Sequence, residues 1–306
     1  MILQYQDTAE KAAALKRPGT RLETLDLVRG ITLVSMILYH GMWDFLYLSE
    51  TGASMTALRT WYEGPGGHLW QQSICRTFIL LSGFCVPFSR HIVRRGLQVS
   101  AGGLAVSAVT ILAMYAERVV FGVLTFLGAA MLVTGAAGLY LPPCARRGKD
   151  AGYSRGKSAA GLAVCLLLFH LTRWINLGYL RLGPSVRLDL PSVLYSYGSG
   201  ELPGYLLTGL GFTMTGFFST DYFSFMPWIF LFLAGFFLNR VLLRDKGPAE
   251  QDSDRENSED PEMAKGPSGN SFWHLQVPVL NLIGRHSLPV YMIHQPVLYL
   301  LTVIFF

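Results

Sequence analysis

Long apolar segments alternate with short charged segments along most of the chain. The first apolar segment, residues 25–48, is long enough to cross a membrane, because about 20 apolar residues at ~1.5 Å each cover the ~30 Å hydrocarbon layer. No stretch shows the ten-residue alternation of barrel strands, which favours helices. The pattern predicts an all-α fold, a polytopic integral membrane helical bundle of about seven transmembrane helices. The other predicted spans are residues 70–88, 97–115, 119–141, 158–177, 221–243 and 287–306.

Residues 203–218 are apolar, but they are few and are interrupted by glycines. They could form a re-entrant segment, a surface hairpin or an eighth span. A full crossing would reverse the next helix and place Arg240 and Arg244 outside, although basic residues normally flank the cytoplasmic ends of spans. We therefore prefer the interpretation in which this segment does not cross the membrane.

Charge divides the chain into four parts. Residues 1–23 are basic and predict a cytoplasmic N-terminal segment, because Lys and Arg are enriched on that side of a membrane. Residues 24–244 form the predicted transmembrane bundle. Residues 245–273 are acidic and have little to bury, so we expect a disordered cytoplasmic linker. Residues 274–306 add the final transmembrane helix, which should end outside.

Composition narrows the class of protein further. Hydrophobic residues make up 51% of the chain and charged residues 15%, which is too apolar for an ordinary soluble domain. The formal net charge of +5 lies at loop edges and indicates topology rather than nucleic-acid binding. The four cysteines lack metal-ligand spacing, and we expect no metal site. Membrane lipid is an expected partner, and the sequence leaves open whether the chain forms a homo-oligomer.

Three ionisable residues interrupt the first apolar segment: Arg29, His40 and Asp44. At about 100° per residue they share one helix face, and Arg29 and His40 are roughly 16 Å apart along the axis. An ionisable group at the centre of a span costs about 2.5–3.5 kcal/mol on insertion scales, so this face predicts a polar interior. An imidazole titrates near neutral pH, and a carboxylate one turn away can fix its tautomer. We favour His40 as a catalytic base oriented by Asp44; a structural hydrogen bond is the alternative.

Basic residues recur at the predicted cytoplasmic ends of the helices. A guanidinium fork suits a phosphate or a carboxylate, so these residues are candidates for binding an anionic ligand. Arg29 has a simpler alternative, a salt bridge to Asp26 one turn earlier, and many of the others could report only topology. The candidates are Arg29, Arg90, Arg94, Arg95, Arg285, His286 and Ser287.

A second set of residues is expected to bind another substrate. Arg76 lies inside the second span and needs a partner, for which Asp44 is at a similar depth. His294 and Gln295 lie midway along the last span; a packed polar pair beside a kink at Pro296 is the alternative. For the aromatic residues near the outer mouth, placement at the membrane interface is the simpler explanation. The candidates are Arg76, Asp221, Tyr222, Trp228, Tyr291, His294 and Gln295.

Five blocks follow one another along the chain: RLETLDLVRGITLVSMILYHGMWDF, FILLSGFCVPFSR, FGVLTFLG, DYFSFMPWIFLFLAGFF and LIGRHSLPVYMIHQP. They resemble the bacterial members of the heparan-α-glucosaminide N-acetyltransferase catalytic-domain family. The resemblance covers most of the chain outside the acidic linker. The Arg-Gly start, with His eleven residues after the Arg, is also similar to membrane acyltransferases that O-acetylate bacterial surface polysaccharides.

The resemblance implies transfer of an acetyl group from cytoplasmic acetyl-CoA, as co-substrate, to an amine or hydroxyl of an extracytoplasmic sugar or glycan. It also implies an integral protein of a bacterial plasma membrane. By motif match, His40 is the catalytic base, Asp44 its partner and Arg29 a donor-side residue. Many bacterial relatives carry His in place of Thr125, and animal lysosomal members have Asn in place of His40 with a catalytic His in the following loop. That loop offers His68 here, so the division of roles between the two histidines stays open.

Two other classes of function remain in competition with an acyltransferase. The ionisable stripe of the first span could be a proton or solute path in a transporter or channel. The absence of detectable inverted repeats and of paired broken helices favours the enzyme. A catalytically inactive interaction protein is the third class.

Overall fold

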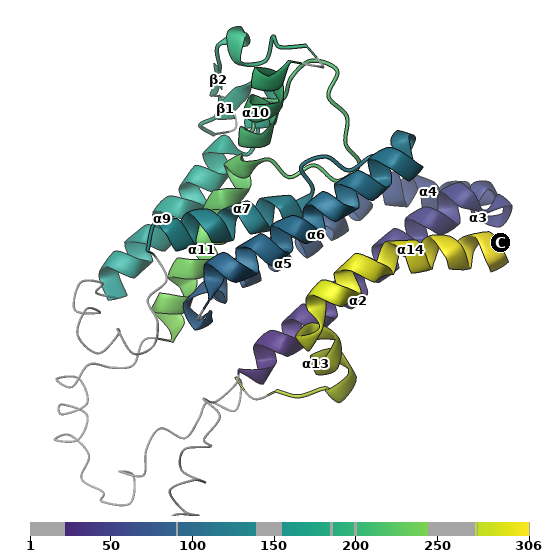
Figure 1. Cartoon of the computed structure of the whole chain (residues 1–306), viewed down its shortest axis with the longest axis horizontal. Coiled ribbons are helices and arrows are strands. Elements are labelled where there is room, and N and C mark those ends of the chain that lie inside the picture. The colour runs from purple at the N-terminus through teal and green to yellow at the C-terminus, as the bar shows by residue number, and fades with distance from the viewer. Residues whose placement is uncertain are drawn as a thin grey trace, which may run out of the picture.

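The computed structural model describes residues 22–89, 91–138, 155–183, 186–198, 201–243, 273 and 275–305. These residues are mostly helical, as the predicted membrane bundle requires (Figure 1). The longer helices are α2 (Glu23–Leu48), α5 (Pro65–Phe84), α6 (Ile92–Ala113), α7 (Val123–Ala136), α9 (Arg155–Thr172), α11 (Phe225–Leu242) and α14 (Ser287–Phe305). The shorter ones are α3 (Glu50–Ser54), α4 (Thr56–Glu63), α10 (Leu202–Leu210) and α13 (Pro278–Arg285), with 3-10 turns η1 (Val86–Phe88), η2 (Tyr115–Glu117), η5 (Ile175–Leu177) and η6 (Ser192–Leu194).

Five of the described helices are long and apolar enough to cross a membrane: α2, α6, α9 with the turn after it, α11 and α14. Helix α5 has 20 residues, but Gln71, Gln72 and Arg76 make it more polar, and it is not one of the five. Helix α7 is apolar but has 14 residues, fewer than the about 20 that a straight crossing needs. The helical membrane bundle is therefore supported, whereas the predicted count of seven spans is not confirmed.

Helix α2 begins and ends where local chemistry favours it. Glu23 and Asp26 lie in its first turn, where negative charge interacts favourably with a helix N-terminus. After its end at Leu48, the hydroxyl of Ser49 accepts the N–H of Gly52 at 2.9 Å and caps α3. The stretch after the first span, which we expected to be a loop, is therefore largely helical, because α3, α4 and the first turn of α5 occupy it.

Helix α11 packs against both α5 and α9 (Figure 1). Its Phe232 and Phe236 are fully buried, as is Ile79 of α5. The side-chain amide of Asn239 donates a hydrogen bond to the carbonyl of Phe84 at 2.9 Å and joins the ends of α11 and α5. Helices α13 and α14 pack on α2, and α2 connects them to α5.

A small lobe follows α9. Strands β1 (Tyr179–Arg181) and β2 (Arg187–Asp189) form an antiparallel hairpin, which the all-α prediction did not include. Helix α10 follows this hairpin in the chain and contacts α11. With nine residues it is about 14 Å long, less than half of the hydrocarbon layer. It is too short to cross the membrane as a helix, and whether its segment enters the membrane stays a prediction.

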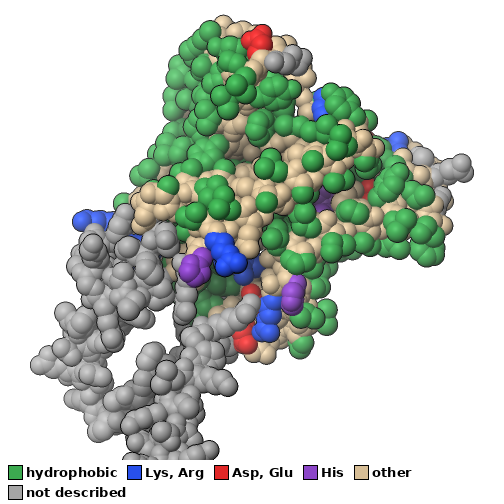
Figure 2. All heavy atoms as spheres, in the orientation of Figure 1, with side chains coloured by type: hydrophobic (Ala, Val, Ile, Leu, Met, Phe, Trp, Pro, Cys, Tyr) green, Lys and Arg blue, Asp and Glu red, His purple; other side chains and the backbone are tan. Residues whose placement is uncertain are grey.

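Much of the surface is apolar. Figure 2 shows hydrophobic side chains over most of one face, with Lys, Arg and His side chains gathered in its lower part. Large exposed hydrophobic residues include Leu104 and Leu112 of α6 and Val303 of α14. Such faces suit contact with lipid, because a soluble protein rarely exposes apolar patches of this extent. Residues 1–21, Arg90, Arg244 and residues 245–272 of the predicted acidic linker lie outside the described residues.

Candidate functional site

A cavity of about 310 Å³ lies where α2, α5, α6, α7, α13 and α14 meet. Its wall includes three arginines from three different helices: Arg29 of α2, Arg95 of α6 and Arg285 of α13. We call it the arginine cavity. The other polar residues of its wall are Ser82, Ser89, Gln98, Ser287 and Tyr291.

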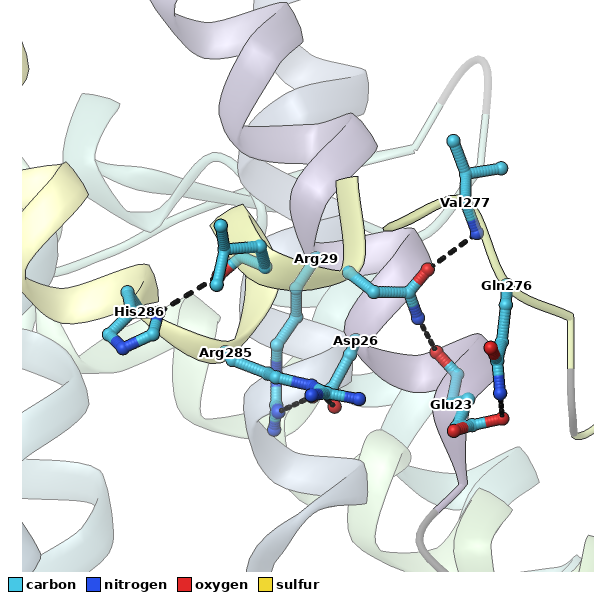
Figure 3. Close-up of polar contacts among 9 residues, drawn as sticks. Glu23, Asp26, Arg29, Gln276, Val277, Arg285 and His286 are labelled. Atoms are coloured by element: carbon cyan, nitrogen blue, oxygen red, sulfur yellow. Dashed lines mark hydrogen bonds and ion pairs between the residues drawn. The ribbon is translucent and has the colours of Figure 1, made fainter. Parts of the chain in front are cut away.

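Helix α13 brings Arg285 to α2 because two glycines allow their backbones to touch. A Cβ atom on Gly30 would lie 2.0 Å from the carbonyl oxygen of Leu280, and one on Gly284 would lie 1.9 Å from that of Asp26. Neither helix could approach so closely with a larger residue at these positions. Hydrogen bonds of the Asn281 side chain to the Glu23 carbonyl, at 2.8 Å, and from the Val277 N–H, at 2.7 Å, fix the start of α13 (Figure 3).

Two arginines of the cavity share one carboxylate. Nη1 of Arg29 lies 3.3 Å from Oδ1 of Asp26, and Nε of Arg285 lies 3.6 Å from Oδ2 of the same residue (Figure 3). Asp26 is 3% exposed, so it holds both guanidinium groups from the protein side. The salt bridge that was the alternative for Arg29 is therefore present, and Arg29 also lines the cavity. With Arg95 included, the cavity keeps a surplus of positive charge.

Ser89 adds a hydroxyl without a partner. It is 6% exposed, and its oxygen makes no hydrogen bond to any of the described residues. By contrast, the hydroxyl of Ser82 donates to the carbonyl of Phe78 at 2.8 Å. Because buried polar groups are normally paired, an unpaired hydroxyl in a cavity wall suits a ligand that offers a hydrogen-bond acceptor or donor.

The structure separates the predicted anion-binding residues into two groups. Arg29, Arg95, Arg285 and Ser287 come together at the arginine cavity. Arg94 and His286 are exposed and do not line it, and the His286 ring lies 3.0 Å from the carbonyl of Leu282.

A second polar group joins α2 to α14, and we call it the seam: His40, Asp44, His294 and Gln295. The ring centroids of His40 and His294 are 5.1 Å apart, and the two ring planes are tilted by 60°. The side-chain amide of Gln295 donates to Asp44 at 3.2 Å from Oδ1 and 3.5 Å from Oδ2. Asp44 is 0% exposed, so this amide stands in for water as its hydrogen-bond donor.

The predicted pairing of Asp44 with His40 is not the one that the structure shows. Both residues lie on the helix face that meets α14, as their spacing requires. The structure gives Asp44 a hydrogen bond from Gln295, and it shows no hydrogen bond between Asp44 and His40. The reason is tertiary, because the donor comes from a helix about 250 residues later in the chain.

Tyr291 connects the seam with the arginine cavity. It lines the cavity, and its ring stacks on Phe78 at 6.0 Å between centroids. The same ring lies 5.4 Å from that of His294, whose ring in turn lies 5.1 Å from that of His40. The cavity wall therefore continues into the pair of histidines.

Arg76 does not reach Asp44. Its Nη2 lies 3.4 Å from Oε1 of Gln72, and its guanidinium lies over the ring of Phe169 at 5.9 Å. Its Nε is buried and makes no hydrogen bond to the described residues. The partner that we predicted for Arg76 was therefore wrong.

Three other predicted substrate residues have contacts that hold elements together. The carboxylate of Asp221 accepts the N–H of Val123 at 3.1 Å and caps the start of α7. Burial raises the pKa of Asp221 to about 6, and the bond from Val123 acts in the opposite direction. Tyr222 donates to the carbonyl of Thr208 at 2.6 Å. The ring of Trp228 packs on that of Phe223 at 4.9 Å, and we call Asp221, Tyr222 and Trp228 the Asp221 cluster.

His68 lies in the first turns of α5 and is exposed. It belongs to a helix rather than to the predicted loop, and it is not part of the seam. Sequence reasoning did not identify Ser82, Ser89 or Gln98 as lining residues. Gln98 could have been found, because it lies three residues after Arg95 and so shares its helix face. No comparable signal marks the two serines.

Comparison with known proteins gives one match. The sequence model of a protein family described as heparan-alpha-glucosaminide N-acetyltransferase, catalytic, matches residues 21–143 and 161–296. These ranges contain the seam and all three arginines of the cavity. The comparison with curated proteins finds no match. The comparison with solved structures finds none either.

Proposed function

The chain belongs to the heparan-alpha-glucosaminide N-acetyltransferase catalytic family, and on this premise we propose the reaction that it catalyses. Membership implies an acetyltransferase, and five helices suited to a membrane imply an integral membrane protein. The proposed reaction moves an acetyl group from cytoplasmic acetyl-CoA to an amine or hydroxyl of a sugar or glycan on the other side. The host membrane is proposed to be a bacterial plasma membrane, with the N-terminus in the cytoplasm.

The observation that carries this proposal is the position of the arginine cavity next to the seam. Coenzyme A carries phosphates, and Arg29, Arg95 and Arg285 offer three guanidinium groups that bind phosphate oxygens through charge-assisted hydrogen bonds. The hydroxyl of Ser89 offers a further hydrogen bond. The cavity volume of about 310 Å³ is at the lower end of the range for small-molecule sites, about 300 to 1,000 Å³.

The donor is proposed to enter with its phosphates at the arginines and its thioester toward Tyr291. At that end of the cavity the wall meets His294 and His40. Positive charge at the proposed cytoplasmic side agrees with the usual enrichment of Lys and Arg there. The acceptor is proposed to reach the same histidines from the opposite side of the bundle.

His40 is proposed to act as the general base. The acceptor oxygen or nitrogen attacks the carbonyl carbon of the thioester, and His40 takes the proton that the acceptor loses. The carbon–sulfur bond then breaks and coenzyme A leaves. General-base catalysis of this kind contributes about 10² to 10⁴ in rate. In a variant of the mechanism, His40 first accepts the acetyl group itself and then passes it on.

The test uses the purified full chain in lipid nanodiscs with labelled acetyl-CoA and D-glucosamine as the acceptor probe. We expect acetylated glucosamine from the wild type and a loss of about 10² to 10⁴ in rate with His40→Ala. His170→Ala is the matched control, because His170 is an exposed histidine of α9 away from the seam. Label retained on the protein with donor alone, and absent in His40→Ala, would identify the acetyl-histidine variant.

The result that contradicts the proposal is equally clear. If glucosamine and oligosaccharides that contain it stay unmodified while sealed vesicles show uptake that depends on His40, the seam is a transport path. Normal transfer by His40→Ala would remove this residue from the chemistry.

A further inference from the structure

His294 has one ring nitrogen fixed and one without a partner. Its Nδ1 lies 2.6 Å from the carbonyl oxygen of Tyr291. A carbonyl oxygen only accepts hydrogen bonds, so Nδ1 must carry the proton of the neutral ring. Nε2 then holds a lone pair, and it is buried without a hydrogen-bond partner among the described residues. The protein therefore fixes the tautomer of His294 and leaves a single basic nitrogen available.

This nitrogen belongs to a ring that is adjacent to two others with distinct places in the site. One is His40, with 5.1 Å between the ring centroids. The other is Tyr291, at 5.4 Å, which lines the arginine cavity. His294 is therefore nearer than His40 to the cavity in which the donor is proposed to bind.

The other ionisable residue of the seam has a different surrounding. Both carboxylate oxygens of Asp44 face the amide of Gln295, at 3.2 and 3.5 Å. An amide group neither takes nor releases a proton at ordinary pH, so Gln295 connects α14 to α2 but does not exchange a proton with Asp44. The role that the sequence suggested for Asp44, a partner to His40, therefore falls to His294, whose ring lies 5.1 Å from that of His40.

We propose that His294 is a second catalytic histidine, which returns the proton to the leaving thiolate; this inference rests on the proposed acetyl transfer. The acceptor loses its proton to His40 as its oxygen or nitrogen bonds to the acetyl carbon. The proton passes from His40 to Nε2 of His294, whose Nδ1–H stays on the Tyr291 carbonyl. When the carbon–sulfur bond breaks, its electron pair goes to sulfur, and Nε2 delivers the proton there. Coenzyme A leaves as the thiol and both imidazoles return to their neutral forms.

Two amide substitutions separate the fixed nitrogen of His294 from the free one. In His294→Asn the side-chain NH₂ reaches about as far as Nδ1, so it can keep the hydrogen bond to the Tyr291 carbonyl while Nε2 is lost. In His294→Gln the amide reaches about as far as Nε2 but carries no proton. A residue that only packs or orients α14 would tolerate Asn, whereas a residue that carries a proton would tolerate neither.

The experiment measures transfer from acetyl-CoA to D-glucosamine by the full chain in nanodiscs, together with acetyl-CoA binding by each variant. We expect both variants to bind acetyl-CoA with an affinity within about threefold of the wild type. We expect their rate of acetyl transfer to fall by a factor of at least about 100. With S-(4-nitrophenyl) thioacetate, whose thiolate leaves without protonation, the loss at His294→Asn should shrink to less than about tenfold. His40→Ala should reduce the rate of transfer by the same factor with both donors.

Three outcomes overturn the inference. They are transfer by His294→Asn within tenfold of the wild type, loss of acetyl-CoA binding in that variant, and an equal loss with both donors. A wild type that transfers nothing contradicts the proposed function itself, whereas an active wild type with an active His294→Asn contradicts only the role of His294.

Discussion

The seam between α2 and α14 and the Asp221 cluster both consist of residues that the sequence marked as site candidates, but their polar atoms differ. In the seam, Nε2 of His294 and Oε1 of Gln295 are buried and have no hydrogen-bond partner among the described residues. In the Asp221 cluster, Asp221 accepts the N–H of Val123, and Tyr222 donates to the Thr208 carbonyl. The seam therefore has buried polar atoms that are free to bind a ligand, whereas the polar groups of the Asp221 cluster already bond to the protein itself.

The difference matters because an unpaired buried polar group costs about 1–3 kcal/mol. Where unpaired buried polar groups gather in one place, the usual reason is that they bind a ligand or take part in catalysis. The arginine cavity fits the same rule through Ser89. The Asp221 cluster follows the opposite rule, because each of its groups contributes to a helix cap, a loop or a packed ring. Substitutions in the two regions should therefore act on different quantities.

The largest effect among the substitutions below is expected at the cavity. Arg95→Ala removes one guanidinium without disturbing Asp26, which Arg29 and Arg285 contact. A hydrogen bond to a charged group is worth about 1.5–3 kcal/mol, so KM for acetyl-CoA should rise about 10- to 100-fold. Steady-state kinetics against Arg155→Ala, an exposed arginine of α9, measures the difference. An unchanged KM would place the donor elsewhere.

A smaller effect, on stability rather than on acetyl transfer, is expected in the Asp221 cluster. Tyr222→Phe removes the hydrogen bond to the Thr208 carbonyl and leaves that buried carbonyl with one partner fewer. The free energy of unfolding should fall by about 1 kcal/mol, while transfer changes less than about threefold. Thermal unfolding in nanodiscs and the transfer assay, run on the same preparation, test this. A strong loss of transfer with normal stability would place Tyr222 in the site after all.

A third effect is a dependence of stability on pH. Burial raises the pKa of Asp221 to about 6, above the ordinary value of an aspartate, so the folded protein holds this proton more tightly than the unfolded chain. The stabilisation is present below about pH 4 and is lost as pH rises through 6. Asp221→Asn should therefore flatten the fall in unfolding temperature between pH 4 and pH 6.5. An identical slope in the wild type and Asp221→Asn would contradict the assignment, and transfer at pH 7 serves as the control.

Helix periodicity predicted which residues share a face of one helix. It could not predict how each helix is rotated relative to its neighbours in the bundle. The charge rule predicted that the arginines gather at one end of the bundle, and three of them line the cavity. Arg94 and Arg95 are neighbours in the sequence, yet about 100° separates them on α6, so only one can face a given partner. Which of the two does so depends on how α6 packs.

The sequence alone determined the start and the end of the first span, its ionisable stripe and the family of the chain. These features depend on hydrophobic periodicity and motif spacing, which are properties of a single segment. The tertiary structure decided the partners. Asp44 accepts a hydrogen bond from Gln295, and the ring of His294 lies next to that of His40. Arg76 contacts Gln72 and Phe169. A partner on another helix is chosen by packing across the whole bundle, where glycine contacts such as that of Gly30 with α13 fix the separation of the helices.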